Sequence, residues 1–396
     1  MKTRLSLFAL LTAGALAGMT SPSALAWNTL NGQQPLVIGH RGASGYLPEH
    51  TLESYTRAIQ QGANFIEPDL VLTKDGHFIA RHEPMLGGTT DVASRPEFAA
   101  YKTTKVVDGV ATTDWFASDF TLAEIKTLRA IQPRANRDQS FNGLYQIPTL
   151  DEVIDLAKTH RVGIYPETKH PTFHQGLGLA MEDALLDKLH TAYGNDRNAP
   201  VFIQSFESAN LQYLNGKTNL KLVQLIDADD VNPDGSMSLV NPYRQPYDFI
   251  VAGDPRTFAD LLTADGLAFI AGYADGVGPW KPYLVTTVAD GIDRTGDGSL
   301  TINDRRVDGS TGVIEAAHAA GLEIHTWTFR NDASGYGFTD PQAEMAYYFR
   351  LGVDGVFTDF PDTGVAALSA VPEPETYALM LAGLGLVGFA ARRRQA

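Results

Sequence analysis

Short apolar runs that alternate with amphipathic segments constrain the fold of this chain more than any other feature. Segments 51–61, 150–159, 178–192 and 311–320 carry apolar residues at helical spacing. Strands alternating with helices predict a parallel α/β sheet, and about eight units in about 340 residues predict a closed (β/α)8 TIM barrel. Nine runs between these segments are predicted as strands: 36–40, 64–72, 78–82, 163–169, 201–206, 221–226, 273–278, 323–329 and 355–359.

One region does not follow this alternation. Residues 84–147 contain no clear strand–helix unit, and they come directly after the second strand region. An insertion above the barrel is therefore predicted there, within a single domain that spans residues 27–370. A domain of this length lies within the range of one α/β barrel with insertions.

The N-terminus has the features of an export signal. Lys2 and Arg4 precede an apolar run over residues 5–19, and Ala24-Leu25-Ala26 offers the small-x-small pattern that signal peptidase cleaves. The run is short for a membrane span, which disfavours the alternative of an N-terminal anchor. Residues 1–26 are therefore predicted to be a removable signal peptide.

The C-terminal segment has three parts. Val371-Pro-Glu-Pro-Glu375 leads into an apolar stretch over residues 376–391, which three arginines close. Residues 371–396 resemble the PEP-CTERM sorting signal of Gram-negative bacteria. The resemblance implies removal of the tail by an exosortase, no stable membrane span afterwards, and a location in the periplasm, on the outer surface or in the medium. A permanent anchor is the alternative, although sixteen residues are marginal for a bilayer.

The composition narrows the possible partners. The formal net charge is −15, and without the two positive charges of the signal and the single net positive charge of the tail it is −18. So acidic a domain argues against nucleic acid or an anionic membrane as a partner, because both require basic patches. The chain has no cysteine, so it forms no disulfide and must build any metal site from oxygen or histidine ligands.

Polar residues with catalytic potential stand at the ends of the predicted strands. In a (β/α)8 barrel the C-terminal ends of the strands lie on one face, where functional sites are built. These residues are therefore expected to share one site. They are His40, Glu67, Asp69, His82, Glu167, Lys169, Gln204, Trp327 and Asp359.

The carboxylates among them predict a metal site. Glu67 and Asp69 are two residues apart in a strand-like run, so their side chains are expected on one face. Two carboxylates that point together into a barrel repel each other unless a cation lies between them, and Glu167 repeats the pattern at the next strand. Three carboxylates form an oxygen site suited to Ca²⁺ or Mg²⁺. The alternative of solvated surface acids is disfavoured by the apolar residues around the pair.

The strongest local motif runs over residues 40–51 with the sequence HRGASGYLPEHT. It resembles the signature of the glycerophosphodiester phosphodiesterase family, in which histidine-arginine-glycine is followed by proline-glutamate-asparagine-threonine. The resemblance covers residues 35–365. Two positions depart from the common pattern: His50 replaces asparagine, as in the periplasmic branch, and Glu83 replaces aspartate. No catalytic role is assigned to His50. Further family segments occur in order at residues 66–70, 79–82, 165–169 and 357–361.

The resemblance implies a metal-dependent hydrolase that releases glycerol 3-phosphate and an alcohol. His40 and His82, expected at adjacent barrel strands, are the implied acid–base pair, since imidazole can give or take a proton near neutral pH. Which histidine is the acid stays open. The glycerol 2-hydroxyl would attack phosphorus and form a cyclic phosphate, which water then opens. Calcium is the favoured cation and magnesium the alternative, with Glu67, Asp69 and Glu167 as ligands.

Five further residues are expected around the substrate. Arg41 would bind the phosphate through paired hydrogen bonds, and Lys169 would add a point charge. Glu49 is expected to orient Arg41 or a metal-bound group, with a helix N-terminal acid as the alternative. Gln204 and Trp327 are expected in the substrate pocket, although plain core packing explains Trp327 equally well.

Residues 293–304 fit a twelve-residue calcium loop. Asp293, Thr295, Asp297 and Asp304 occupy positions 1, 3, 5 and 12, and glycine occupies position 6. A terminal aspartate in place of glutamate is closer to the dockerin-type variant. A second, structural calcium site is therefore predicted, against the alternative of a polar surface loop.

Two other functions compete with this prediction. A barrel phospholipase of the C or D type would use the same histidines and metal, but it needs an apolar membrane-facing loop that residues 84–147 do not offer. A catalytically inactive barrel could bind surface polysaccharide, but it would be expected to have lost some of the acid–base, metal and phosphate-binding residues. Head-group preference and oligomeric state do not follow from these motifs.

Overall fold

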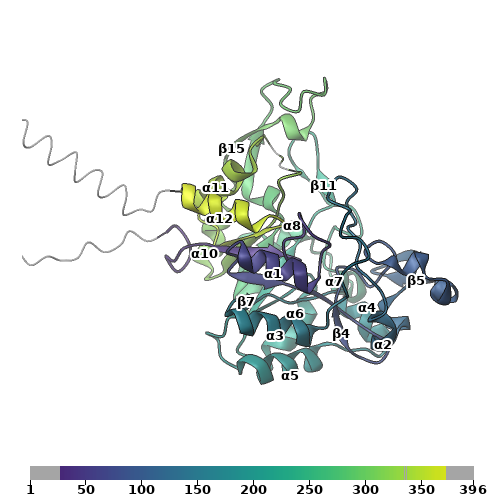
Figure 1. Ribbon diagram of the computed structural model, residues 1–396. Helices are drawn as coiled ribbons and strands as arrows, with labels where there is room; N and C mark the ends of the chain where they lie inside the picture. The colour runs from purple at the N-terminus through teal and green to yellow at the C-terminus, as the bar shows by residue number, and fades with distance from the viewer. Residues whose placement is uncertain (1–26, 334, 336, 372–396) are drawn as a thin grey trace, which may run out of the picture. The chain divides into compact units, whose positions relative to one another are not determined.

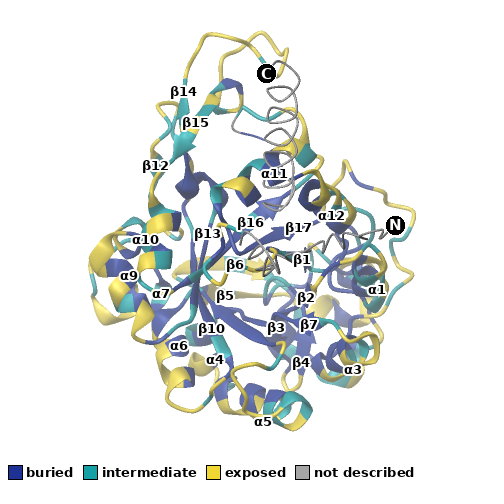
Figure 2. Ribbon diagram, turned by 90° about the vertical axis from the view of Figure 1, so that its left-hand side faces the viewer, coloured by how far each residue is buried: buried dark blue, intermediate teal, exposed yellow. Residues whose placement is uncertain are grey.

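Eight parallel strands close into a barrel in the computed structural model of the protein, which describes residues 27–333, 335 and 337–371. The barrel closes because β1 pairs with both β17 and β2, so the predicted fold class is confirmed. Figure 2 shows these strands as a buried centre surrounded by helices. They are β1 (Leu36–His40), β2 (Phe65–Glu67) with β3 (Asp69–Leu72), β7 (Gly163–Ile164) with β8 (Glu167–Thr168), β9 (Phe202–Ser205), β10 (Lys221–Ile226), β13 (Gly276–Pro279), β16 (Glu323–Phe329) and β17 (Gly355–Thr358).

Both predicted sorting signals lie outside the described residues, apart from Val371 at the start of the tail. Trp27 to Val371 form one unit. Within the described part of the chain, no helix is long and apolar enough to cross a membrane.

Two barrel strands are interrupted by proline. Pro68 separates β2 from β3, and Pro166 lies between β7 and β8. Proline has no N–H to donate, but the carbonyl oxygens of Pro68 and Pro166 accept from the N–H groups of Glu167 and Gln204, both at 2.9 Å. The interruptions therefore leave the barrel wall joined, and they fall beside the predicted metal ligands.

The prediction that residues 78–82 form a barrel strand is wrong. β4 (Phe78–Ala80) pairs antiparallel with β3, as the outer arm of a hairpin. The connection over residues 73–77 is too short for a crossover to a parallel strand, which needs a dozen residues or more. His82 therefore follows this hairpin arm and does not stand at the end of a barrel strand.

Helices cover the outside of the barrel, and local sequence explains where several of them begin. Thr51 caps the first, and Thr149 with Glu152 forms a capping box on the second. Pro341 and Pro361 begin the last two. The helices that follow successive strands are α1 (Leu52–Gln60), α3 (Leu150–His160), α5 (Glu182–Tyr193), α6 (Ser208–Asn215), α9 (Ala264–Ala271), α10 (Val313–Ala319), α11 (Pro341–Leu351) and α12 (Pro361–Ala370) (Figure 1).

The interior of the barrel is filled by side chains. The rings of Tyr165 and Phe202 stack at 4.9 Å, and the Tyr165 hydroxyl lies 2.7 Å from Nδ1 of His325. Ile38, Val223 and other buried residues complete this layer. The barrel is therefore a packed core and not a pore, which leaves chemistry to the strand ends.

Residues 84–147 form a separate apolar cluster on the barrel, around Phe98, Phe120 and Leu128. Their only antiparallel hairpin in the described structure turns at Asp108 and Gly109, which have φ values of 47° and 80°. The hairpin tip lies at the strand-end face. The elements are η1 (Asp91–Ser94), η2 (Pro96–Tyr101), β5 (Thr103–Val107), β6 (Val110–Asp114), η3 (Ala117–Asp119) and α2 (Leu122–Ile125).

Other short elements extend the loops between barrel units. β14 and β15 form a hairpin that projects from the barrel and carries the predicted calcium loop (Figure 2). The extensions are α4 (Pro171–Gly176), β11 (Asp230–Val231), β12 (Met237–Ser238), α7 (Tyr247–Ala252), α8 (Phe258–Leu261), η4 (Lys281–Leu284), β14 (Val285–Val288), η5 (Ile302–Asp304) and β15 (Arg306–Ser310).

Candidate active site

A cavity of about 750 Å³ lies at the C-terminal ends of the barrel strands. The insertion contributes Val107, Asp108 and Val110 to its wall. Asp69 lies beside the cavity, where it contacts Arg41 and the two glutamates Glu67 and Glu167. The predicted site residues that line the cavity are His40, Arg41, Glu49, Glu67, His82, Glu167, Lys169, Gln204 and Trp327.

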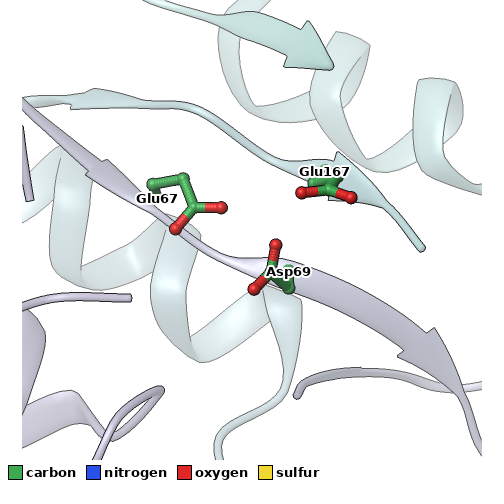
Figure 3. Close-up of side chains that lie close together, drawn as sticks. All are labelled: Glu67, Asp69 and Glu167. Atoms are coloured by element: carbon green, nitrogen blue, oxygen red, sulfur yellow. The ribbon is translucent and has the colours of Figure 1, made fainter. Parts of the chain in front are cut away.

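Three buried carboxylates converge at the base of this site. Glu67, Asp69 and Glu167 each offer an oxygen, and these oxygens lie within 4.8 Å of one another. Figure 3 shows Glu67 and Asp69 on one strand path and Glu167 on the neighbouring one. Among the described residues this is the only such group of three or more potential ligands. The structure thus brings together the three residues predicted as metal ligands.

The electrostatics of the three carboxylates differ. Burial and the charge of Asp69 raise the pKa of Glu67 well above its usual range. Burial raises the pKa of Glu167 to about 8 although the Lys169 charge opposes the change. The pKa of Asp69 is well below its usual range, because a hydrogen bond from His50 and nearby positive charge outweigh burial. A divalent cation would relieve the repulsion that these buried groups exert on one another.

Gln204 adds an amide oxygen to the donor set. Its Nε2 donates to Oε1 of Glu67 at 3.2 Å, while its own Oε1 is buried without a hydrogen-bond partner. Carboxylate and amide oxygens are the ligands that calcium and magnesium take in proteins. The residues present therefore fit a divalent cation.

Arg41 lies among the acids of the site. Its backbone N–H donates to Oε2 of Glu67 at 2.8 Å, and its Nη1 donates to Oε2 of Glu49 at 3.2 Å. Its Nε is 3.3 Å from Oδ2 of Asp69. Arg41 and Gly42 have φ values of 59° and 87°, so the turn after β1 needs a glycine beside the arginine.

His40 has a partner to which the sequence assigned no role. Its Nδ1 lies 2.5 Å from Oδ1 of Asp359, and both side chains are buried. Oδ2 of Asp359 accepts from Arg137 at 2.6 Å and from Arg330 at 2.9 Å. Burial and the Arg41 charge lower the pKa of His40 to about 4, against the effect of Asp359.

His82 occupies a more open position, with 30% of its side chain exposed. Its Nδ1 lies 3.2 Å from Oε1 of Glu83, and its Nε2 lies 3.5 Å from Nζ of Lys169. Nζ of Lys169 is also 3.0 Å from Oε1 of Glu167. Although part of the side chain is exposed, desolvation of the ring inside the cavity and the charges of Arg41 and Lys169 lower the pKa of His82 well below its usual range. Lys169 thus lies between His82 and Glu167, one of the three carboxylates.

His50 lies behind the carboxylates. Its Nε2 is 2.9 Å from Oδ2 of Asp69, and its Nδ1 is 2.7 Å from the hydroxyl of Tyr55. The ring is fully buried and does not line the cavity. Its contact with Asp69 therefore orients one of the three carboxylates from outside the cavity.

Trp327 takes part both in the wall of the cavity and in packing. Its Nε1 donates to the carbonyl of Gly278 at 2.7 Å, and its ring meets Phe206 edge to face at 5.8 Å. Both aromatic residues line the cavity. Trp327 therefore both lines the cavity and packs against its neighbours, so the two predicted roles do not exclude each other.

Several residues of the site were not predicted from the sequence. Asp227 follows β10 directly and could have been found by its place at a strand end. Asp108 lies in the insertion and His170 follows Lys169, so no spacing rule relates these two cavity residues to the site. Arg137, also in the insertion, reaches the site through its contact with Asp359. Only the folded chain shows that they reach it.

The predicted calcium loop is not assembled into a metal cluster. Oδ1 and Oδ2 of Asp293 accept from Gly296 N at 2.6 Å and Gly298 N at 2.8 Å, and Oδ1 of Asp304 accepts from Thr295 N at 2.8 Å. Among the described residues, the loop acids do not form a group of three close ligand atoms. The structural calcium site stays a prediction.

Comparisons with known proteins identify the family of the chain. The sequence model of the glycerophosphoryl diester phosphodiesterase family matches residues 40–254 and 283–363. The chain belongs to this family. A glycerophosphodiester phosphodiesterase of Arabidopsis thaliana is 35% identical over 350 residues, covering 84% of this chain and 85% of the relative. That of Haemophilus influenzae is 33% identical over 402 residues, covering 94% of this chain and 100% of the relative.

Membership of the glycerophosphoryl diester phosphodiesterase family makes the chain a phosphoric diester hydrolase. A solved structure from Silicibacter pomeroyi assigned to the family has a TM-score of 0.55 at 21% identity, covers 87% of this chain and 98% of its own, and supports the barrel fold. The PEP-CTERM protein-sorting motif matches residues 370–394, which confirms the resemblance of the tail and indicates export.

Proposed function

We propose that the protein hydrolyses glycerophosphodiesters to glycerol 3-phosphate and an alcohol, with a divalent cation on Glu67, Asp69 and Glu167. His40 and His82 carry the protons. The observation that supports this best is that the buried carboxylates share one cavity with two histidines, and that each histidine has its own carboxylate partner. This arrangement supplies charge neutralisation and proton transfer in one place.

The proposed reaction has two steps. The glycerol 2-hydroxyl attacks phosphorus and passes its proton to one imidazole, while the other imidazole gives a proton to the departing alcohol oxygen. Water then opens the cyclic phosphate: the deprotonated imidazole takes a proton from the water, and the protonated imidazole returns its proton to the glycerol 2-oxygen as the bond from that oxygen to phosphorus breaks. The cation, calcium by preference and magnesium as the alternative, would neutralise the phosphate and make the hydroxyl easier to deprotonate.

The other residues bind and orient the substrate. Arg41, held by Glu49, would donate paired hydrogen bonds to the phosphate oxygens, and Lys169 would add a second positive charge. Trp327 would form an apolar wall for the glycerol, and Gln204 would line the same pocket.

Processing at both ends is part of this proposal. Signal peptidase would cleave after Ala26, and an exosortase would remove the tail that follows Ala370. The enzyme would then act in the periplasm, on the outer surface or in the medium. The mass of the mature protein, measured after secretion, tests both cleavages.

The activity is tested with the protein from Trp27 to Ala370 and glycerophosphocholine. Release of glycerol 3-phosphate is measured in a coupled assay after chelation and after Ca²⁺ or Mg²⁺ is restored. We expect activity to return with the metal and to be lost in His40→Ala. No release with either metal would contradict the proposed function.

A further inference from the structure

A charged contact links His82 to the tip of the insertion hairpin. Nε2 of His170 lies 2.9 Å from Oε2 of Glu83, and its Nδ1 lies 2.7 Å from Oδ2 of Asp108. The other oxygen of Glu83 is 3.2 Å from Nδ1 of His82. The four side chains thus form one continuous path along the cavity wall.

The backbone is unusual at both residues of the contact between His170 and Asp108. His170 itself has a φ of 47° and precedes Pro171, the first residue of α4. Asp108, at the turn between β5 and β6, also has a φ of 47°. This conformation is uncommon for residues other than glycine. The structure around His170 and around Asp108 must therefore hold each backbone in this conformation, and this places the two side chains in contact.

Each ring nitrogen of His170 faces a carboxylate oxygen, an arrangement that favours the protonated ring. Burial alone would lower its pKa, but the carboxylates of Glu83 and Asp108 raise it to about 10. Lys169 lies beside His170 in the chain, and Glu207 binds Thr172 on α4. His174, also on α4, has its pKa lowered to about 3 by burial and by His170. Both ring nitrogens of His170 consequently carry a proton that can be donated to a carboxylate.

We propose that His170 is a positioning residue for His82: it holds Glu83 against Nδ1 of His82 and fixes the insertion hairpin at the same point. This inference rests on the proposed function, because it concerns one of the two proton carriers. A carboxylate at Nδ1 favours the proton on that nitrogen and leaves Nε2 for exchange in the cavity. The insertion then belongs to the catalytic apparatus through Asp108.

The same path explains what Glu83 does in the place of aspartate. Its side chain is 34% exposed, so contact with His82 alone would leave it free to turn toward solvent. The longer glutamate reaches His82 with one oxygen and His170 with the other. His170 therefore holds one oxygen of Glu83, and this leaves the other oxygen in place against His82.

Kinetics of His170→Ala, His170→Gln and Asp108→Asn in the otherwise complete mature enzyme test this role. We expect kcat to fall about ten-fold in both His170 variants and less in Asp108→Asn, with KM within two-fold of wild type. Added imidazole should restore part of the kcat of His170→Ala. Glu83→Gln with His170→Ala should be no slower than Glu83→Gln alone, because both changes break one path.

His318→Ala is the matched control. Nε2 of His318 is 2.9 Å from Oδ2 of Asp354, and its side chain is 18% exposed, as is that of His170. His318 lies on α10 and does not line the cavity. Its removal should leave kcat and KM unchanged.

Two kinetic results would overturn the inference: a kcat within two-fold of wild type in folded His170→Gln, or a rise in KM alone. Failure of the proposed function is distinguishable, because it would appear as absent turnover in the wild type. The ring-nitrogen chemical shifts of His82, read by ¹⁵N NMR, then decide the matter without turnover. A shift toward a mixture of tautomers in His170→Gln supports the role, and unchanged shifts contradict it.

Discussion

The two histidines of the site lie in contrasting surroundings. His40 ends a barrel strand, and its partner Asp359 is 2% exposed and is held in turn by Arg137 and Arg330. His82 follows a hairpin arm outside the barrel, and its partner Glu83 is one-third exposed. Asp359 is thus held by two arginines, one from the insertion and one that follows β16, whereas Glu83 is held by His170.

The comparison shows that the fold holds the carboxylate partner of His40 more firmly than that of His82. A side chain on a packed strand is held by neighbours that cannot move without opening the core, whereas a loop residue depends on a few polar contacts. We therefore expect changes on the His40 side to cost more activity than equivalent changes on the His82 side.

The largest loss of activity is expected from a change in the three carboxylates, because the His40 side and the His82 side both depend on them. Glu167→Gln removes a carboxylate that belongs to the triad and contacts Lys169. We expect kcat/KM to fall roughly a thousand-fold, equivalent to about 4 kcal/mol, with weaker metal binding in calorimetry. The exposed Glu53→Gln serves as the control. Full activity in Glu167→Gln would rule out the three-carboxylate site.

The second prediction tests the anchored side. Asp359→Asn should lower kcat about a hundred-fold, because the amide cannot stabilise the protonated ring of His40 as a carboxylate does. Asp332→Asn is a close control, since Asp332 also binds Arg137, at 2.7 Å, but contacts Asp359 only through it. Steady-state kinetics of the two variants should differ by at least ten-fold. Equal effects would mean that the arginine matters and the His40 contact does not.

The third prediction tests the looser side. Glu83→Asp keeps the charge but shortens the side chain, so one carboxylate can no longer reach both His82 and His170. We expect a loss in kcat of about three-fold, smaller than that of Asp359→Asn, measured on the same substrate. A loss as large as that of Asp359→Asn would remove the contrast between the two sides.

A fourth prediction concerns stability and pH. The pKa of His170 is raised from 6.5 to about 10 by its two carboxylate partners, although burial opposes the change. Its contribution to the free energy of unfolding is therefore fully present below about pH 6.5 and is lost as pH rises toward 10. The stability difference between wild type and His170→Gln, measured by urea denaturation, should be larger at pH 6 than at pH 10. An equal difference at both values would show that His170 is not charged.

The smallest effect is expected far from both histidines. Asp293→Ala should lower the melting temperature by a few degrees in calcium and leave turnover unchanged, because the loop is expected to bind a structural ion. Thermal unfolding with calcium and with chelator separates the two conditions. Lost turnover at unchanged stability would contradict a structural role.

Much of the barrel and the core of the site could be predicted from the sequence. The strand bounds of 36–40, 221–226 and 323–329 agree with β1, β10 and β16, because buried parallel strands are continuous apolar runs. Residues 78–82 have the same apolar composition, yet they form a hairpin arm. Composition reports burial, and only the short connection to β3 decides which neighbour the strand takes.

The sequence by itself determined the family, the barrel and the residues that end its strands, since strand ends of a barrel meet on one face whatever their loops do. The tertiary structure alone decided how these residues are paired. Asp359 lies 319 residues from His40, and Asp108 lies 62 residues from His170. Such contacts depend on barrel closure, on the path of the insertion and on individual side-chain conformations, and no local spacing encodes them.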